Sequence, residues 1–211
     1  MKPAFATARN TNGSPAQDWA RALQLTAPIV RNPARIFPAV IGERAAQYGD
    51  APALLSDGEC LTYRQLAARV NRYARWAIAQ GIGKGQCVGL LMPNCPEFMA
   101  IWLGITKAGG VVALLNTHLT GPLLAHCINI VAPQHIIAAA DLRDALDTAL
   151  PHLVQSPVVW SHGAGTDAFR GFDDAVLTER ELPSVTIDDR ALYIFTSGTT
   201  GPPKAARWYR R

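Results

Sequence analysis

Residues 193–204 read YIFTSGTTGPPK, and this stretch decides which fold the rest of the chain is expected to adopt. An apolar run leads straight into a turn that is rich in hydroxyl groups and glycine and that ends with Lys204. Glycines allow backbone N–H groups to converge on an anion, hydroxyl groups donate hydrogen bonds without adding negative charge, and a lysine supplies a compact positive charge. Pro202 and Pro203 are expected to stiffen the exit of the turn and to aim Lys204. The stretch therefore predicts a strand followed by a polyphosphate-binding loop.

Two other interpretations of this stretch stay open on the residues alone. It could be a polar turn after a strand, because Thr, Ser and Gly are common in turns and an exposed lysine is ordinary there. It could also be a nucleotide P-loop of the form GxxxxGK[ST], because Gly198 stands six positions before Lys204. The P-loop interpretation fits poorly, since Pro203 occupies the place of the second glycine and Ala205 that of the Ser or Thr that would hold magnesium.

The sequence before this stretch alternates between strand and helix patterns. From residue 50 onward, short β-rich runs alternate with helical patterns, which is typical of a parallel α/β fold. The clearest helix starts at Thr62, because Thr62 and Gln65 have the spacing of a capping box, and Gly81 supplies its stop. We therefore expect a layered, mostly parallel sheet flanked by helices. The expected strands are 87–92, 111–115, 135–139, 158–160 and 192–195, and further helices are expected at 96–109, 120–131, 141–150 and 172–180.

The composition describes a folded chain and excludes several classes of function. Hydrophobic residues make up 49% and charged residues 17% of the 211 residues, which is a globular balance. Lys and Arg total 20 against 16 Asp and Glu, but they are scattered, so no nucleic-acid partner is expected. The four cysteines and five histidines lack the spacing of metal ligands or of a redox pair, so we assign no metal ligand. A reduced, cytoplasmic location is the simpler interpretation.

The sequence does not favour a secreted or membrane-spanning protein. The first thirty residues lack the continuous apolar core of a secretory signal. The most apolar tract, residues 88–115, is interrupted by Pro93, Glu97 and Lys107, which would be costly inside a bilayer. Peripheral contact with a membrane stays open.

As an ordered string, TSGTTGxPK resembles the phosphate-loop signature of the adenylate-forming enzymes, which include acyl-CoA synthetases, luciferases and peptide-synthetase adenylation domains. The strings LTYRQL at 61–66, VGLLMPNCPEF at 88–98 and GITKAGGVVALLN at 104–116 are similar to the N-terminal subdomain of these ligases at comparable spacing. The resemblance covers residues 35–206, so residues 1–34 are assigned as an N-terminal extension and 207–211 as an atypical end, expected to be disordered. Together with the phosphate-loop stretch, LNTHLTGPLLAHC at 115–127 is most similar to very-long-chain acyl-CoA synthetases and fatty acid transport proteins.

The resemblance implies a reaction in two steps. A carboxylate, here a long- or very-long-chain fatty acid, joins the α-phosphate of MgATP with release of pyrophosphate, and the thiol of coenzyme A then displaces AMP to give a thioester. The implied cofactors are ATP, Mg²⁺ and coenzyme A. The residues that the resemblance places on the β- and γ-phosphates are Thr196, Ser197, Gly198, Thr199, Thr200, Gly201 and Lys204.

The resemblance also implies that parts of such a ligase are missing from this sequence. The acidic residue that helps to bind magnesium, the aspartate that binds ribose, the hinge and the small C-terminal domain have no counterpart in it, so no catalytic residue is assigned. We therefore expect an incomplete N-terminal part of the ligase fold that is inactive alone. Two alternatives stay open: a noncatalytic nucleotide-binding or interaction module, and a phosphotransferase of an unrelated α/β fold.

Overall fold

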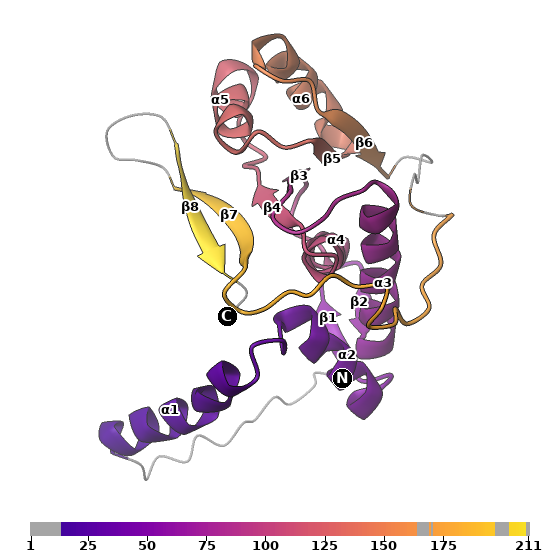
Figure 1. The fold of residues 1–211 in the computed structure, drawn as a ribbon. Helices are drawn as coiled ribbons and strands as arrows, with labels where there is room; N and C mark the ends of the chain where they lie inside the picture. Colours follow the sequence, from indigo (N-terminus) through magenta and orange to yellow (C-terminus); the bar gives the residue numbers. More distant parts are fainter. Residues whose placement is uncertain (1–13, 164–168, 170, 197–202, 210–211) are drawn as a thin grey trace. The chain divides into compact units, whose positions relative to one another are not determined.

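A computed structural model describes residues 14–163, 169, 171–196 and 203–209 of the chain (Figure 1). The chain divides into two compact units, Met1–Pro33 and Ala34–Arg211. The first unit contains the helix α1 (Pro15–Arg31), which begins with a capping box. The Ser14 hydroxyl accepts a hydrogen bond from the Gln17 amide at 3.3 Å, and the Gln17 side chain accepts one from the Ser14 amide at 2.9 Å. These bonds satisfy donors that a helix start otherwise leaves without partners.

The second unit is built on a six-stranded sheet with the strand order β6-β5-β3-β4-β7-β8. The first five of these strands are parallel to one another, and β8 is antiparallel to β7. A two-stranded antiparallel hairpin, β1 and β2, lies apart from this sheet. The strands are β1 (Pro52–Leu55), β2 (Cys60–Thr62), β3 (Cys87–Leu91), β4 (Val111–Leu114), β5 (His135–Ala139), β6 (Val158–His162), β7 (Arg190–Thr196) and β8 (Lys204–Tyr209).

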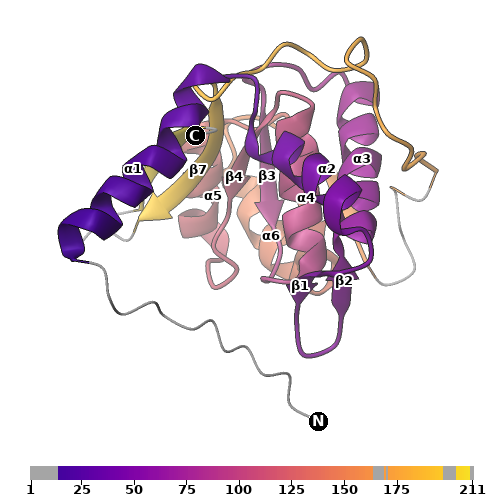
Figure 2. The same cartoon turned by 90° about the horizontal axis from the view of Figure 1, so that it is seen from below.

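Helices cover both faces of the sheet, as Figures 1 and 2 show from two directions. Adjacent residues of a strand point to opposite faces, and β5 illustrates the division. Ile137 packs in the core cluster with α3 and α4, whereas Ile136 packs in the cluster with α5 and α6. The expected layered, mostly parallel α/β sheet is therefore confirmed. The helices of this unit are α2 (Phe37–Tyr48), α3 (Tyr63–Ala79), α4 (Pro96–Lys107), α5 (Gly121–Val131) and α6 (Arg143–Ala149), with short 3₁₀ turns at Ala140–Leu142 and Leu150–His152.

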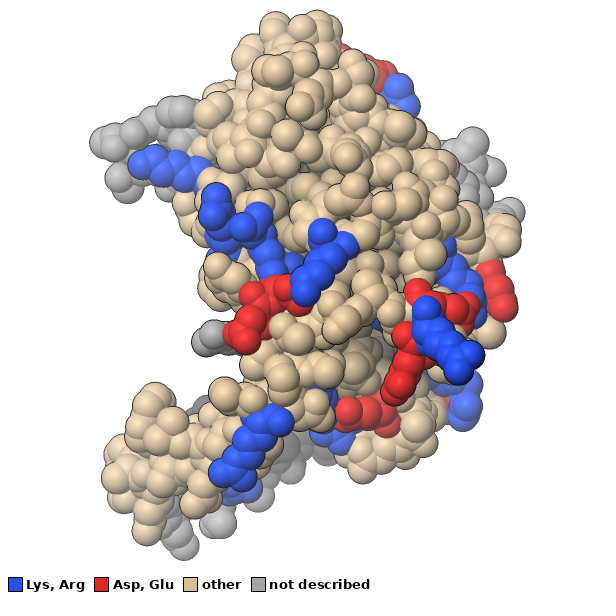
Figure 3. All heavy atoms as spheres, in the orientation of Figure 1, with Lys and Arg blue, Asp and Glu red and all other residues tan. Residues whose placement is uncertain are grey.

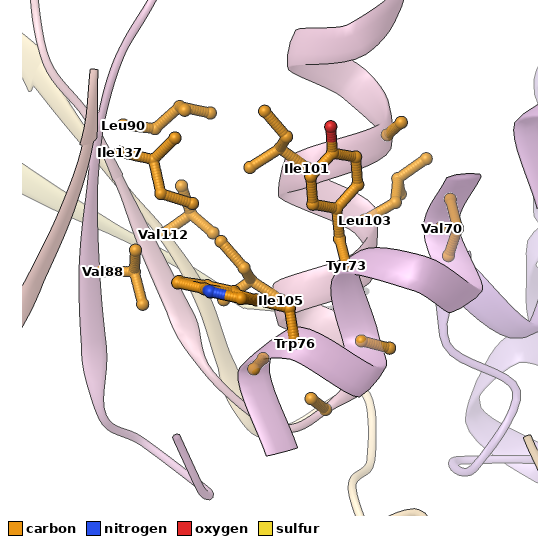
Figure 4. Close-up of a cluster of buried hydrophobic side chains, with 14 of the residues drawn as sticks. Val70, Tyr73, Trp76, Val88, Leu90, Ile101, Leu103, Ile105, Val112 and Ile137 are labelled. Carbon is orange, nitrogen blue, oxygen red and sulfur yellow. The ribbon is translucent and has the colours of Figure 1, made fainter. Parts of the chain in front are cut away.

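The larger core lies between α3, α4 and the sheet (Figure 4). Trp76 of α3 is fully buried, and its ring meets those of Trp160 and Phe169 edge-on at centroid distances of 5.4 and 5.2 Å. Gly104 lets α3 and α4 approach closely, because a Cβ atom at Gly104 would lie 2.5 Å from the Cβ of Tyr73. Burial of aromatic surface and the close contact between α3 and α4 therefore hold these helices against this face of the sheet.

Two sequence predictions were wrong. The expected helix at 172–180 is absent. This segment lies alongside α3 and consists of turns and irregular structure. Within it Leu177 is buried while Val176 is 81% exposed, so the segment lacks the apolar stripe that would hold a helix on the body. The expected disorder after residue 206 is also not seen for the described residues, because Arg207 and Trp208 pair with Tyr193 and Leu192 in the β7–β8 ladder.

Candidate functional site

The candidate site lies where the parallel strands end. Because parallel strands run in one direction, β3, β4 and β7 present their carboxyl ends at the same edge of the sheet. β3 connects through α4 to β4, its neighbour on one side. β4 then connects through α5 to β5, which lies on the other side of β3. The connections that leave β3 and β4 therefore run in opposite directions across the sheet, which is a reversal between these two strands. Ligands of open α/β sheets bind outside the carboxyl ends of strands at such a reversal. β7 lies next to β4 and brings the phosphate-loop stretch to this edge.

The neck of the predicted phosphate loop is the end of the β7–β8 hairpin. Thr196, the last residue of β7, is paired with Lys204, the first residue of β8. The Thr196 hydroxyl donates a hydrogen bond to the Lys204 carbonyl oxygen at 3.4 Å. The structure therefore brings these two predicted site residues together. The other predicted site residues lie outside the described part of the chain; they are Ser197, Gly198, Thr199, Thr200 and Gly201.

α5 holds the returning side of this neck. The Nε2 atom of His126 lies 3.2 Å from the carbonyl oxygen of Pro203, and because a carbonyl oxygen accepts, Nε2 carries the proton. This contact fixes the backbone just before Lys204, at the point where the loop rejoins the sheet. His126 is not among the site residues predicted from the sequence. It lies within the string at 115–127 that contributed to the family resemblance, but nothing in that string indicated a contact with the loop.

A cavity of about 240 Å³ opens at the reversal between β3 and β4. Asn94 and Asn116 bring amide groups and Thr117 brings a hydroxyl group to this cavity, whose other lining side chains are apolar. Asn116 is fixed, because its side-chain oxygen accepts a hydrogen bond from the His118 amide at 2.9 Å. The cavity carries no charged side chain among its described lining residues, so it suits an uncharged part of a ligand. Its lining consists of Met92, Pro93, Asn94, Phe98, Leu114, Leu115, Asn116 and Thr117.

A buried polar network, which we call the Glu97 network, ties α3, α4 and β6 together at the same edge. Glu97 in the first turn of α4 accepts hydrogen bonds from Tyr73 and Arg69. The Tyr73 hydroxyl oxygen also lies 3.2 Å from Nε2 of His162 at the end of β6. Burial alone would raise the pKa of Glu97, but the His162 ring, whose Nε2 lies 3.9 Å from the carboxylate, and the hydrogen bonds from Tyr73 and Arg69 lower it to about 2.

The Glu97 carboxylate is therefore ionised at neutral pH, and each of its two oxygens accepts a hydrogen bond. Arg69 also bonds Glu59 at 2.6 Å, so the network holds two carboxylates. A carboxylate at a helix start is favoured by the helix dipole. These features describe a device that fixes the first turn of α4 against β6 and not a general acid or base.

The neck of the loop carries groups that bear on two of the implied cofactors, ATP and Mg²⁺. The cationic Lys204 fits phosphate oxygens, whereas the Thr196 hydroxyl donates its one hydrogen to the Lys204 carbonyl oxygen. Among the residues that the structure describes, no group of three or more His, Cys, Asp or Glu side chains could hold a metal ion. The described residues therefore give no cage of their own for Mg²⁺.

A family model, AMP-binding enzyme, matches residues 41–208. The chain belongs to the AMP-binding enzyme family. The match runs from α2 to the second last residue of β8 and so contains the sheet, the neck of the loop and the Glu97 network.

Curated relatives of this family member include fatty acid transport proteins and a ligase. It is 36% identical over 163 residues to long-chain fatty acid transport protein 6 of Mus musculus, covering 72% of this chain and 26% of that protein. It is 37% identical over 177 residues to the medium/long-chain-fatty-acid–CoA ligase FadD6 of Mycobacterium tuberculosis, covering 81% of this chain and 29% of that ligase. The chain thus spans less than a third of the length of these relatives.

Solved structures of related ligases share the fold. The N-terminal domain of FACL13 from Mycobacterium tuberculosis, bound to an inhibitor, aligns with a TM-score of 0.73 at 26% identity, over 83% of this chain and 44% of that one. The anthranilate CoA ligase AuaEII in complex with anthranoyl-AMP aligns with a TM-score of 0.75 at 20% identity, over 83% of this chain and 35% of that one. The fold of this AMP-binding family member is that of the N-terminal domains of adenylate-forming ligases.

The surface and helices of the described part add two observations. On the face shown in Figure 3, several of the Lys and Arg side chains lie beside Asp and Glu side chains. None of the helices in the described ranges has both the length and the apolar character needed to cross a bilayer.

Proposed function

We propose that this chain is part of an acid–thiol ligase that activates a carboxylic acid with ATP, through an acyl-adenylate, to the acyl-CoA thioester. The observation that carries the proposal is the neck of the loop. In a member of the AMP-binding enzyme family, Thr196 and Lys204 face each other across the β7–β8 hairpin at the carboxyl edge of the sheet. The stretch between them is the string TSGTTGxPK. We assign residues 35–206 to the N-terminal portion of the AMP-binding domain and residues 1–34 to an extension.

The proposed role of the loop is to hold the β- and γ-phosphates of ATP. As a carboxylate attacks the α-phosphate, negative charge accumulates on the departing pyrophosphate, and fixed donors and a cation stabilise that charge. Lys204 supplies the cation, and His126 holds the backbone at Pro203 from which Lys204 departs. The proposed donors are Thr196, Ser197, Gly198, Thr199, Thr200 and Gly201. Mg²⁺ is proposed to arrive with the phosphates, whose oxygens it prefers, and coenzyme A is the proposed second substrate.

The proposed acid is a fatty acid of long or very long chain, because the names of the relatives refer to long-chain fatty acid transport and to medium/long-chain ligation. The proposed location is the cytoplasm with peripheral contact to a membrane. The helical spacing of Trp19, Leu23 and Val30 places them on one face of α1, and this apolar face supports the contact. An exposed tryptophan and aliphatic side chains on one helix suit a membrane interface.

Carboxylate-dependent exchange of pyrophosphate into ATP tests the proposal. A hybrid in which residues 35–206 replace the matching segment of the mycobacterial ligase FadD6 is expected to exchange pyrophosphate when a fatty acid is added, and the chain alone is expected to be inactive. The alternative, a noncatalytic nucleotide-binding or interaction module, predicts that the chain binds ATP while a correctly folded hybrid forms no adenylate. Transfer of the γ-phosphate to an acceptor would favour a phosphotransferase instead.

A further inference from the structure

A second cavity lies away from the loop, between α2, α3 and the segment at 174–176. We call it the Lys107 cavity, after the last residue of α4. Its volume is about 500 Å³, within the range of about 300–1,000 Å³ that small-molecule sites occupy. The side chains around it are mostly small and apolar. The lining consists of Pro38, Ile41, Gly42, Ala45, Ala46, Arg64, Ala67, Ala68, Val70, Asn71, Lys107, Asp174, Ala175 and Val176.

Lys107 is held in this cavity by an uncharged partner. Its ammonium group donates a hydrogen bond to the side-chain oxygen of Asn71 at 2.6 Å. Asn71 is 5% exposed, and its side-chain nitrogen donates in turn to the Asp174 carbonyl oxygen at 3.1 Å. Both the oxygen and the nitrogen of the Asn71 side-chain amide are therefore hydrogen-bonded, which keeps its oxygen directed at Lys107.

The charge of Lys107 is not balanced by a carboxylate. Among the described residues no Asp or Glu forms an ion pair with it, whereas the other charged groups of the lining have partners. Arg64 pairs with Asp50 at 3.1 Å, and Asp174 pairs with Arg72 at 3.5 Å. Burial, and then the nearby positive Arg75, lower the pKa of Lys107. A half-buried ammonium without a counter-ion is costly, so an anion that entered here would relieve that cost.

From this geometry we propose that the Lys107 cavity is a second binding site, which takes an amphipathic monocarboxylate. The carboxylate pairs with the Lys107 ammonium, and its apolar group lies against the alanines of α2 and α3. The site lies at the end of α4, whereas Glu97 and the β3–β4 reversal lie at its start, so it is separate from the edge that carries the loop. The proposal does not depend on ATP use, and it stands or falls without the proposed ligase activity.

Calorimetric titration of the whole chain with octanoate tests the charge requirement. Octanoate is expected to bind, octanol to bind at least tenfold more weakly, and octylammonium not to bind, because only the carboxylate neutralises Lys107. Lys107→Gln keeps a donor for Asn71 but removes the charge, and it is expected to weaken octanoate binding at least tenfold. Lys84→Gln is the matched control, since Lys84 pairs with Asp189 at 3.0 Å away from the cavity.

A second variant keeps the charge and removes the space. Ala68→Phe is expected to block octanoate while Lys107 stays intact, which protects the test against loss of folding in Lys107→Gln. Labelling with an amine-reactive reagent gives an independent readout, because octanoate should protect Lys107 but not Lys84. Failure of octanoate to bind the wild-type chain, or equal binding by the wild type, Lys107→Gln and Ala68→Phe, would overturn the proposal.

Discussion

At the residue scale, the loop neck and the Glu97 network use side chains in opposite ways. Lys204 begins β8 at the exposed end of a hairpin, where its charge can meet a ligand. Glu97 accepts hydrogen bonds from Arg69 and Tyr73 of α3, and Tyr73 in turn contacts His162 of β6, so the charge of Glu97 is stabilised by groups inside the protein. Two predictions separate these roles.

Replacing Gly198 or Gly201 by Val is expected to impair ATP use in the hybrid ligase without unfolding it. A β-branched side chain restricts the backbone and crowds the phosphates, at a cost on the order of 1–3 kcal/mol, which lowers exchange by about 5- to 150-fold. Gly58→Val is the matched control, because a Cβ atom at Gly58 meets nothing within 4 Å. Full exchange activity in both loop variants, with unchanged circular dichroism, would favour the polar-turn interpretation.

Glu97 makes stability depend on pH in the acid range. Its pKa in the folded chain is about 2, below the ordinary value of 4.5, so the ionised form stabilises the fold. This contribution is complete above about pH 4.5 and is lost as the pH falls toward 2. Glu97→Gln is expected to lower the free energy of unfolding at pH 7 by on the order of 3 kcal/mol and to flatten its fall between these pH values. Urea unfolding at several pH values measures this, and an unchanged pH profile in the variant would contradict the assigned role.

At the element scale, the sequence predicted the parts whose signals are local. The five parallel strands lie within two residues of the predicted ranges, because each is a short apolar run with glycine or proline near its ends. The capping box at Thr62 and Gln65 marked the start of α3, and it is present. The antiparallel strand β8 was missed, because residues 204–209 show no strand periodicity and are ordered by pairing with β7. The Glu97 network was also beyond prediction, since His162 is brought to Glu97 by the β6–β5–β3 order of the sheet.

Replacement by alanine is expected to change stability in opposite directions at two helical glycines, because only Gly104 lies at the close contact between α3 and α4. Gly104→Ala is expected to destabilise the chain by about 1–3 kcal/mol, because the new Cβ would lie 2.5 Å from the Tyr73 Cβ and 2.8 Å from the Val70 carbonyl oxygen. Gly42→Ala in α2 meets nothing within 4 Å and is expected to stabilise by roughly 0.5–1 kcal/mol. Thermal unfolding of both variants checks this pair. Equal stability of the two would show that the α3–α4 approach is not as close as described.

The apolar face of α1 predicts binding to lipid vesicles. Trp19→Gln combined with Val30→Gln is expected to reduce co-sedimentation of the chain with phosphatidylcholine–phosphatidylglycerol vesicles by about tenfold or more, because less apolar area enters the interface. Val154→Gln combined with Val176→Gln is the matched control, since these valines are 84% and 81% exposed elsewhere in the chain. Equal sedimentation of both double variants and the wild type would contradict the proposed membrane contact of α1.

At the scale of the whole molecule, the fold and the family are established, and the chemistry depends on what the loop does. The family model covers α2 to β8, but the chain spans 26% and 29% of the transport protein and the ligase described above. The sequence predicted the fold class and the place of the loop at a strand end. It could not predict the contact of His126 with Pro203 or the Lys107 cavity, because both join segments that only the tertiary fold brings together.

The central claim is tested most directly by the rate of fatty-acid-dependent pyrophosphate exchange. This rate is compared between the hybrid ligase with Lys204 and its Lys204→Ala variant. Lys204 acts on phosphate charge in the transition state and not on the acyl group. Its loss should cost on the order of 2–4 kcal/mol of transition-state stabilisation, which slows exchange by about 30- to 1,000-fold, while the affinity for the fatty acid stays unchanged. Unchanged exchange kinetics in Lys204→Ala would contradict the assignment of residues 196–204 as the phosphate-binding loop.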